Sequence, residues 1–348
     1  MMLSYSLTAL AATVAFCTLS SAVNITVFQP GVPLAPSPLP PPGAASNSDK
    51  IVAQFNLLGR TTVWNLVKKI KFEGDTGEPE GMINLGEERY IISTGHYTSS
   101  TVSYGNHTIV NGTDRTPGSG YGRLSIYDGQ GQQVADATLS AVGDIEYHIG
   151  GIDYDGTKIW ATFAQYRPNT TATIISVDPH TMDKTVLLHY RDHLGGIVHD
   201  PAYQQLVTLN WGSRNATTWN LQATANPYPQ FSFPTSTVRN PSFWADYQDC
   251  KFLGHPAIYN YRSVMICSGV TSLSSNVTIG GLALIDTATM IPLSEVPITM
   301  VSDLGTIVTE NPFDVDIVNG RLRVYFLPDQ HNSTLYIYEP VQNSPYEY

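Results

Sequence analysis

The sequence has little cysteine, little positive charge and only one extended hydrophobic run. Three of its 348 residues are cysteine, and 18 Lys and Arg stand against 29 Asp and Glu, which gives a formal net charge of −11. The basic residues are dispersed, apart from three lysines within residues 68–71. Because nucleic-acid binding requires a concentrated basic surface, the composition argues against nucleic acid as a partner.

Several catalytic motifs are also absent from the sequence. It contains no Gly-x-Ser-x-Gly motif, no glycine-rich phosphate-binding loop, no Cys-x-x-Cys pair and no His-Glu-x-x-His motif. These motifs carry covalent serine hydrolysis, nucleotide binding, thiol redox chemistry and zinc hydrolysis, respectively. None of these activities is predicted for this chain.

The one extended apolar run, residues 7–19, lies at the N-terminus and is followed by the small residues Ser20, Ser21 and Ala22. The run is too short to span a membrane, and no stop-transfer pattern follows it. We therefore predict a signal peptide at residues 1–22, entry into the secretory pathway, secretion, and no transmembrane segment after cleavage.

Glycosylation and cysteine usage agree with export. Seven Asn-x-Ser/Thr sequons are present, at Asn24, Asn106, Asn111, Asn169, Asn215, Asn276 and Asn332. Each is a predicted N-glycosylation site in a secreted chain. Cys17 would leave with the signal peptide, so Cys250 and Cys267 are the predicted disulfide pair, a structural bridge worth roughly 3 kcal/mol on the loop-entropy model.

The domain organisation follows from composition. Residues 23–49 are rich in proline, which favours extended polyproline geometry, and we expect a linker with no core to join. Residues 50–340 have uniform composition and are long enough for one large all-β domain. Residues 341–348 are expected to form a C-terminal tail.

Short strands separated by turn signals recur along this domain. Residues 146–179 contain three of them, at 151–154, 158–164 and 173–178, with Asp-Gly and Asp-Pro turns between apolar, β-branched runs. The same pattern begins again at 195–200, and weaker copies begin at 80–83, 255–258 and 312–315. Five such units predict an all-β fold, a β-propeller with five blades. The alternative is a propeller with six blades, in which residues 51–72 form a whole blade instead of one closing strand.

A functional site is expected at one mouth of the propeller channel. The inner strand of each blade begins on the face where the second strand ends, so two sets of polar residues converge there. The residues expected on this face are Glu78, Glu80, His148, His193, His255, Glu310, His96, Tyr97, Gln165, Tyr166, Arg167, Asn210, Trp211, Arg214, Asp329, Gln330 and His331. Histidines beside carboxylates suit general acid–base catalysis near neutral pH.

Two of these histidines stand out. A histidine at the end of a strand more often hydrogen-bonds a neighbouring loop than performs chemistry. His148 and His193, however, occupy the same offset in neighbouring blades, two residues before a Gly-Gly pair. Glycines at these positions permit close backbone approach, which is a structural use.

A metal site is only weakly indicated. Six-bladed lactonase-like propellers hold calcium with Glu, Asn and Asp oxygens. Glu78, Glu80, Asn210 and Asp314 are the residues that would do so here, but they form no compact ligand motif. We therefore predict no metal and no cofactor, with calcium as the alternative.

Longer stretches of the chain resemble a known family. The stretches are residues 72–81, 146–155 with Ile-Trp-Ala-Thr at 159–162, Gln-Tyr-Arg-Pro-Asn at 165–169, and 193–200 with Leu-Asn-Trp-Gly-Ser-Arg-Asn at 209–215. Together they resemble secreted fungal β-propeller proteins, most of unknown function. Some of these are similar to the hetero-Diels–Alderases of tropolone–sesquiterpenoid biosynthesis, which join a tropolone o-quinone methide to a humulene-type alkene without a cofactor.

This resemblance implies roles for the residues on the predicted face. His148 or His193 would act as the general acid that helps a hydroxymethyl-tropolone lose water, and Arg167 or Arg214 would hold the tropolone oxygens. The remaining predicted site residues are Glu78 as a catalytic carboxylate, and Tyr97, Tyr166, Trp211, Trp244, Gln165 and His255 as substrate-binding residues.

Two other classes of function stay open. One is a calcium-dependent lactonase or strictosidine-synthase-like enzyme. The other is a non-catalytic secreted propeller that binds a glycan or a protein, since several sequons fall in loops around the predicted face. The blades differ greatly in loop length, which favours one asymmetric pocket for small-molecule substrates and therefore an enzyme.

Overall fold

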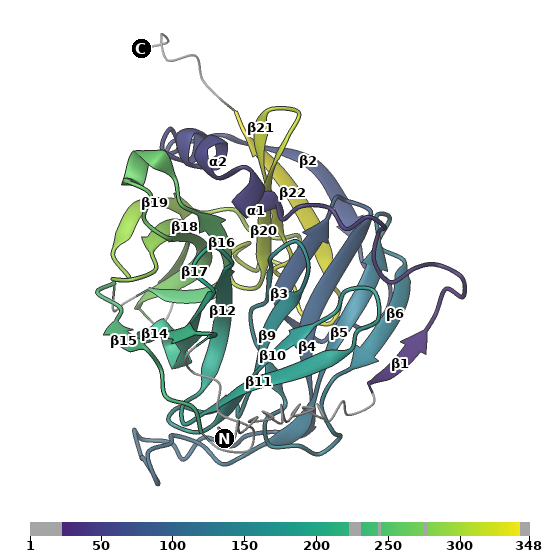
Figure 1. Cartoon of the computed structure of the whole chain (residues 1–348), viewed down its shortest axis with the longest axis vertical. Helices are drawn as coiled ribbons and strands as arrows, with labels where there is room; N and C mark the ends of the chain where they lie inside the picture. The colour runs from purple at the N-terminus through teal and green to yellow at the C-terminus, as the bar shows by residue number, and fades with distance from the viewer. Residues whose placement is uncertain (1–22, 223–230, 243–244, 275–276, 342–348) are drawn as a thin grey trace, which may run out of the picture.

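Five antiparallel sheets, arranged as the blades of a β-propeller, make up most of the molecule (Figure 1). The computed structural model describes residues 23–222, 231–242, 245–274 and 277–341. The predicted all-β fold with five blades is confirmed. The alternative of six blades is wrong, because residues 51–72 supply the end of one helix and a single closing strand.

Within each blade, the strands follow one another from the channel outward. The first contains β3 (Glu78–Leu85), β4 (Arg89–Ser99), β5 (Ser119–Asp128), β6 (Gln133–Thr138) and, at its outer edge, β1 (Asn24–Val27). The second contains β7 (His148–Ile149) and β8 (Asp153–Tyr154), both paired with β9 (Ile159–Ala164), then β10 (Ala172–Val177) and β11 (Lys184–Tyr190). The third contains β12 (Leu194–Asp200), β13 (Gln205–Asn210), β14 (Asn215–Asn220) and β15 (Ser236–Arg239), with the short helix η1 (Trp211–Ser213) after β13.

The last two blades complete the ring. The fourth contains β16 (Asp246–Gly254), β17 (Val264–Ser274), β18 (Val277–Asp286) and β19 (Pro292–Ile298). The fifth contains β20 (Phe313–Val318), β21 (Arg321–Phe326) and β22 (Thr334–Pro340), and β2 (Trp64–Lys71) forms its outer strand. Strand β2 pairs with β22 from Trp64 opposite Pro340 to Lys71 opposite Thr334, so the two ends of the domain are held together in one sheet.

The proline-rich N-terminal segment is not a linker without core contacts. Strand β1 pairs with β6, and the chain then runs along the propeller to helices α1 (Gly43–Ser46) and α2 (Ser48–Phe55) (Figure 1). Ala35, Ile51 and Phe55 are fully buried within two of the hydrophobic clusters. Extended proline-rich chain makes no internal hydrogen bonds, so it can follow an apolar surface where one is offered. That surface exists only in the folded propeller. The sequence pattern of the segment therefore did not predict its contacts with the core.

Helix α1 covers the end of the channel at which the inner strands finish. It packs against β16 and β20, and the space left beneath it is only about 10 Å³. A side chain at Gly43 would place its Cβ 2.8 Å from the carbonyl oxygen of Val315, so the fit requires glycine. This end of the channel is closed by the chain itself.

The fourth blade begins earlier than its sequence pattern indicated. Its inner strand is β16, whereas residues 255–258, predicted to start the blade, lie in a turn with the short helix η2 (Ala257–Tyr259). Strand β16 carries Asp246, Asp249 and Lys251, so it does not read as an apolar run. On β16, Cys250 lies directly opposite Cys267 of β17, and the predicted disulfide between them is confirmed.

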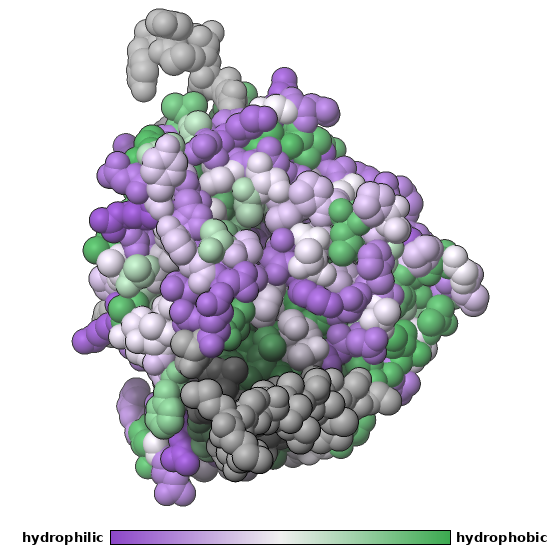
Figure 2. All heavy atoms as spheres, viewed as in Figure 1, coloured by the Kyte–Doolittle hydropathy of each residue, from purple (hydrophilic) through white to green (hydrophobic). Residues whose placement is uncertain are grey.

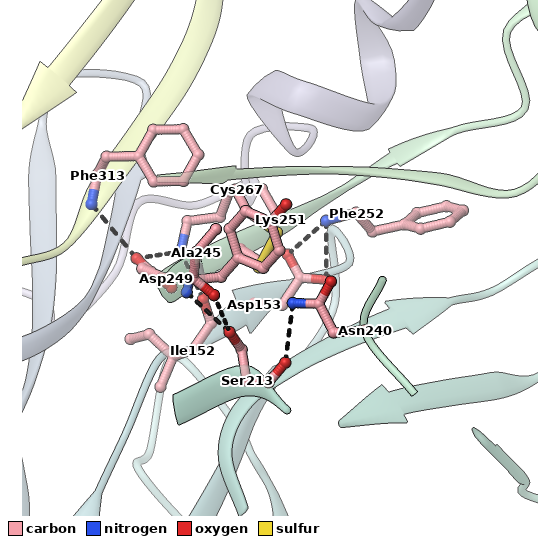
Figure 3. The surroundings of a disulfide bond; sticks show 12 residues. Ile152, Asp153, Ser213, Asn240, Ala245, Asp249, Lys251, Phe252, Cys267 and Phe313 are labelled. Carbon is pink, nitrogen blue, oxygen red and sulfur yellow. Dashed lines mark hydrogen bonds and ion pairs between the residues drawn. A yellow bond between two sulfur atoms is a disulfide. The ribbon is translucent and has the colours of Figure 1, made fainter. Parts of the chain in front are cut away.

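Charged groups are buried at the centre of the propeller. The Lys251 ammonium donates to Asp249 Oδ2 at 2.7 Å and to the carbonyl oxygen of Ile152 at 2.6 Å (Figure 3).

Three buried carboxylates each accept a backbone N–H group from a neighbouring blade. Asp153 accepts from His199 at 2.9 Å, Asp249 from Phe313 at 3.4 Å and Asp314 from Asn84 at 2.7 Å. Burial raises the pKa of Asp153 and Asp314 to about 7 and that of Asp249 to about 6, and Lys251 opposes each rise. These carboxylates join the blades to one another near the axis.

The face seen in Figure 2 is mainly hydrophilic, with hydrophobic residues in separate groups between polar ones. In the described part of the chain, no helix has the length and apolar character needed to cross a membrane.

Candidate functional site at the open mouth of the channel

The end of the channel opposite α1 is where the inner strands begin, and most of the predicted site residues gather there. Strand β3 contains a bulge at Glu80, since Pro79 pairs with Thr94 and Gly81 with Ser93. Such an extra residue changes the direction in which the neighbouring side chains of the strand point. Similar irregularities interrupt β12 at Gly195 and β16 at Gln248. The inner strands are therefore irregular at their starts, which is where the candidate site lies.

His148 and Glu80 form a buried pair at this mouth. His148 Nε2 lies 3.1 Å from Glu80 Oε1, and the His148 side chain is 6% exposed. Burial alone would lower the pKa of His148, but Glu80, through its charge and hydrogen bond, and Glu78, through its charge, together raise it. Among the described residues, His148 Nδ1 has no hydrogen-bond partner. The pair thus holds a histidine whose pKa is raised and whose buried Nδ1 has no partner among the described residues.

His193 lies beside His148, and its pKa is shifted in the opposite direction. The two ring centroids are 5.4 Å apart. Burial, reinforced by the charges of His148 and Arg115, lowers the pKa of His193 to about 3, although its hydrogen bond to a backbone carbonyl opposes the shift. Its Nδ1 lies 2.7 Å from the carbonyl oxygen of Gln165, and because a carbonyl only accepts, Nδ1 carries the proton. Neighbouring groups with pKa values pushed apart are a feature of acid–base sites.

The Gly-Gly pairs that follow the two histidines pack against each other. Gly151 N donates to the carbonyl oxygen of Gly195 at 2.8 Å. A Cβ at Gly150 would lie 1.9 Å from that same oxygen, so no larger residue fits. The predicted close approach of backbone is therefore present, and it fixes the spacing of His148 and His193.

Aromatic rings surround the two histidines. Tyr166 lies 4.8 Å from His148 and 5.3 Å from Trp211, and Trp211 lies 4.8 Å from His193, all as ring-centroid distances. Tyr97 lies 6.1 Å from Tyr166. Three of the four aromatic residues predicted for substrate binding are thus brought together. The fourth, Trp244, lies outside the described residues.

Glu78 also faces this cluster. It accepts from Tyr97 Oη at 3.2 Å and from Gln330 Nε2 at 2.8 Å. Burial and the neighbouring charge of Glu80 raise the pKa of Glu78, against the opposing effects of His148 and the two hydrogen bonds. A carboxylate of raised pKa is a better proton acceptor near neutral pH.

Arg115 is a member of the site that sequence reasoning missed. It comes from the long loop between β4 and β5, residues 100–118, and its guanidinium lies 4.6 Å from the Trp211 ring and 5.4 Å from the Tyr166 ring. Asp114 holds it through two hydrogen bonds of 2.9 and 3.0 Å. Nothing in the spacing of residues 100–118 predicted that the loop would return to the channel mouth.

The two predicted arginines are used differently. Arg214 donates to the carbonyl oxygens of Gly212 and Ala245 and so ties the third blade to the fourth. Arg167 donates from Nε and Nη2 to Gln165 Oε1 at 2.9 and 2.7 Å, and both residues line a separate pocket beside the mouth.

His255 does not lie at this mouth. It follows the end of β16, near α1, and its Nε2 lies 2.9 Å from Asp200 Oδ2. The error has the same origin as the misplaced start of the fourth blade. With β16 assigned to residues 246–254, His255 falls at the closed end of the channel.

The oxygen ligands suggested for calcium do not form one group. Glu78 lies at the mouth, while Asp314 accepts two backbone N–H groups near the closed end. Asn210 donates to Asp192 and accepts from the N–H of Asn215. Across the described ranges, no three His, Cys, Asp or Glu residues are arranged to hold a metal ion.

The sequons that the structure describes are mostly on the surface. Exposed asparagines are Asn24, Asn106, Asn111, Asn169 and Asn332. Asn215 is half-buried in β14, and Asn276 lies outside the described residues. Glycosylation at these positions stays a prediction.

Comparison with known proteins identifies the family. The profile of a family described as a family of unknown function (DUF6454) matches residues 39–344. The chain belongs to this family. No curated protein sequence matches it.

Solved structures resemble the chain only in architecture. A hypothetical protein from Leishmania major has 9% identity and a TM-score of 0.43, over 78% of this chain and 90% of that one. A luciferin-regenerating enzyme has 8% identity and a TM-score of 0.41, over 81% of this chain and 95% of that one. Coronin from Toxoplasma gondii, in its WD40 domain, has 9% identity and a TM-score of 0.35, over 83% of this chain and 88% of that one.

Proposed function

We propose that this protein is a secreted, cofactor-free enzyme that acts on small molecules at the open mouth of the channel. The observation that carries the proposal is the buried His148–Glu80 pair, whose free ring nitrogen lies among aromatic rings. A histidine kept protonated by a carboxylate is suited to donate a proton to a leaving group. Burial beside neutral His193 limits the water that would compete for this proton.

The reaction that we favour is a dehydration followed by a hetero-Diels–Alder cycloaddition. Its support is the resemblance of residues 72–81, 146–155, 159–162, 165–169, 193–200 and 209–215 to secreted fungal propellers, some of which are similar to the hetero-Diels–Alderases of tropolone–sesquiterpenoid pathways. His148 donates its proton to the departing hydroxyl of a hydroxymethyl-tropolone, and Glu78 accepts the proton of the ring hydroxyl. The o-quinone methide forms by loss of one molecule of water, with no net oxidation or reduction.

The second step needs positioning and no further proton transfer. The heterodiene and a humulene-type alkene form one C–C and one C–O bond, and all their atoms stay in the product. Tyr97, Tyr166 and Trp211 supply apolar walls that hold the alkene against the heterodiene, where positioning can contribute several kcal/mol. Arg115, at the edge of these rings, takes the role of binding the tropolone oxygens that the resemblance implied for Arg167 or Arg214.

The test is to incubate the purified protein with a hydroxymethyl-tropolone and humulene, with and without a chelator. Adduct formation and stereochemistry are followed by chiral chromatography with mass detection. We expect one stereoisomer, formed faster than background, insensitive to chelator and lost in His148→Ala. Racemic adduct at the background rate would overturn the cycloaddition, and dependence on added calcium would favour the lactonase class.

A further inference from the structure

A second pocket opens beside the channel mouth, and the proposed reaction does not use it. This side pocket has a volume of about 500 Å³ and lies between residues 104–113 of the β4–β5 loop and the residues that follow β9. Its lining includes Tyr104, Arg167, Thr170, Thr171, Arg191 and Phe231, and it contains no Asp or Glu. The volume is in the range of small-molecule binding sites.

Charge sets this pocket apart from the rest of the protein. The chain has a net charge of −11, yet two arginines line one pocket without a carboxylate in the lining. Within the described ranges, neither Arg167 nor Arg191 forms an ion pair. A guanidinium has five N–H donors, of which Arg167 directs two to Gln165 Oε1. That contact fixes the plane of the guanidinium, as bidentate binding of a carboxylate requires.

The rest of the lining suits a hydroxylated ring. The Arg191 guanidinium lies over the Phe231 ring, 4.4 Å from its centroid, and the His189 ring stacks on Phe231 with 4.5 Å between centroids, so the aromatic group holds the cation at the pocket. The hydroxyls of Thr170 and Thr171 already donate their protons, to the carbonyl oxygen of Arg167 and to Glu146, so toward a ligand they act as acceptors. A pyranose carries a rim of hydroxyls that can donate to such acceptors.

We propose that the side pocket binds a hydroxylated carboxylic acid of monosaccharide size, a uronic acid unit. The two arginines receive the carboxylate, and the oxygens of Thr170 and Thr171 accept hydrogen bonds from the ring hydroxyls. The inference does not rest on the proposed reaction, because His148, Glu80 and Glu78 do not line this pocket.

The experiment measures binding of D-galacturonate and D-glucuronate, with D-galactose and D-glucose as neutral counterparts. Asn111 and Asn169 also line the pocket and are sequons, so the protein is made in a bacterial host that forms disulfides and adds no N-glycans. Saturation-transfer NMR and calorimetry at low and high salt report the affinity. We expect saturable binding of at least one uronate, and we expect salt to weaken it. The neutral counterpart of that uronate is expected to bind with an affinity lower by about tenfold or more.

The variants are Arg191→Gln and, as a matched control, Arg60→Gln. Both remove one exposed positive charge, but Arg60 lies outside the pocket. Arg191→Gln is expected to weaken uronate binding about tenfold, with an unchanged melting temperature, and Arg60→Gln to leave it unaltered. Absence of saturable uronate binding would overturn the proposal. So would equal binding of the neutral sugars, or an equal loss in both variants.

Discussion

In the described part of the propeller, two pairs join a buried histidine to a carboxylate, and they differ in how fully their carboxylates are used. At the open mouth, His148 is the one hydrogen-bond partner found for Glu80 in the described part of the chain. The second pair joins His199 Nδ1 to Asp155 Oδ2 at 2.8 Å. Asp155 also accepts from Trp160 Nε1, from Thr157 and from the N–H of Lys158, each at 2.7 to 2.8 Å.

The difference separates a pair fitted for chemistry from one fitted for structure. Burial would raise the pKa of Asp155, but the hydrogen bonds from His199, Lys158, Thr157 and Trp160 outweigh it and hold the pKa well below its usual range. This carboxylate is fixed as an acceptor that joins the second blade to the third. Glu80 has no comparable set of donors, and its charge instead serves to raise the pKa of His148.

The largest expected effect is the loss of turnover when the mouth pair is broken. His148→Ala or Glu80→Gln is expected to lower the rate of the proposed dehydration by about 10²- to 10⁴-fold, the usual contribution of a general acid. Steady-state kinetics measure the rate, and circular dichroism and the melting temperature check the fold. Full activity in both variants would show that the acid is another residue.

Breaking the other pair is expected to affect stability instead. Asp155→Ala leaves several buried donors without an acceptor and is expected to reduce the free energy of unfolding by about 3–5 kcal/mol. Denaturant unfolding measures the change. Turnover per folded molecule is expected to stay at the wild-type level below the lowered melting temperature, so a drop comparable to that of His148→Ala would erase the distinction between the pairs.

The pH dependence of turnover distinguishes the pairs further. The rate is expected to fall as pH rises through the raised pKa of His148, because neutral imidazole cannot protonate the leaving hydroxyl. In Glu80→Gln, burial then acts with less opposition and lowers the pKa, so this limb moves to lower pH. The negative charge of Glu80 also stabilises protonated His148 in the folded protein. This contribution to the free energy of unfolding is fully present below the pKa that histidine has in the unfolded chain, and it is lost as pH rises through the raised pKa of His148 in the folded protein.

Profiles of turnover against pH for wild type and Glu80→Gln provide the check. Asp155→Asn serves as the matched control, since it removes a charge from the other pair and is expected to leave the limb in place. An unmoved limb in Glu80→Gln, or an equal shift in both variants, would rule out Glu80 as the cause.

The smallest expected effect concerns Arg115. Arg115→Met keeps the length of the side chain but removes the guanidinium proposed to bind the tropolone oxygens, where hydrogen bonds from a charged donor contribute about 1–2 kcal/mol. We expect KM for the tropolone to rise about five- to thirtyfold. The melting temperature is expected to fall only slightly, through loss of the cation over Trp211 and Tyr166. Arg60→Met is the control for loss of a surface charge, and an unchanged KM in Arg115→Met would remove Arg115 from substrate binding.

Much of the fold could be predicted because local signals recur in it. Alternation of short β-branched runs with Asp-Gly and Asp-Pro turns indicated the blades, and the pairing of Cys250 with Cys267 followed from their being the two cysteines outside the predicted signal peptide. His148 and His193 were found through their shared offset before the Gly-Gly pairs. Strand β16 was missed, since its buried Asp249 and Lys251 neutralise each other only in the folded propeller.

The sequence by itself determined the all-β class, the five repeating units and the candidate histidines, because each depends on residues that are neighbours in the chain. Only the tertiary structure decided that Glu80 partners His148, that Arg115 reaches Trp211, and that the N-terminal segment closes one end of the channel. Those contacts join residues between 68 and about 270 positions apart, and their geometry is set by the closure of the ring, which no local pattern encodes.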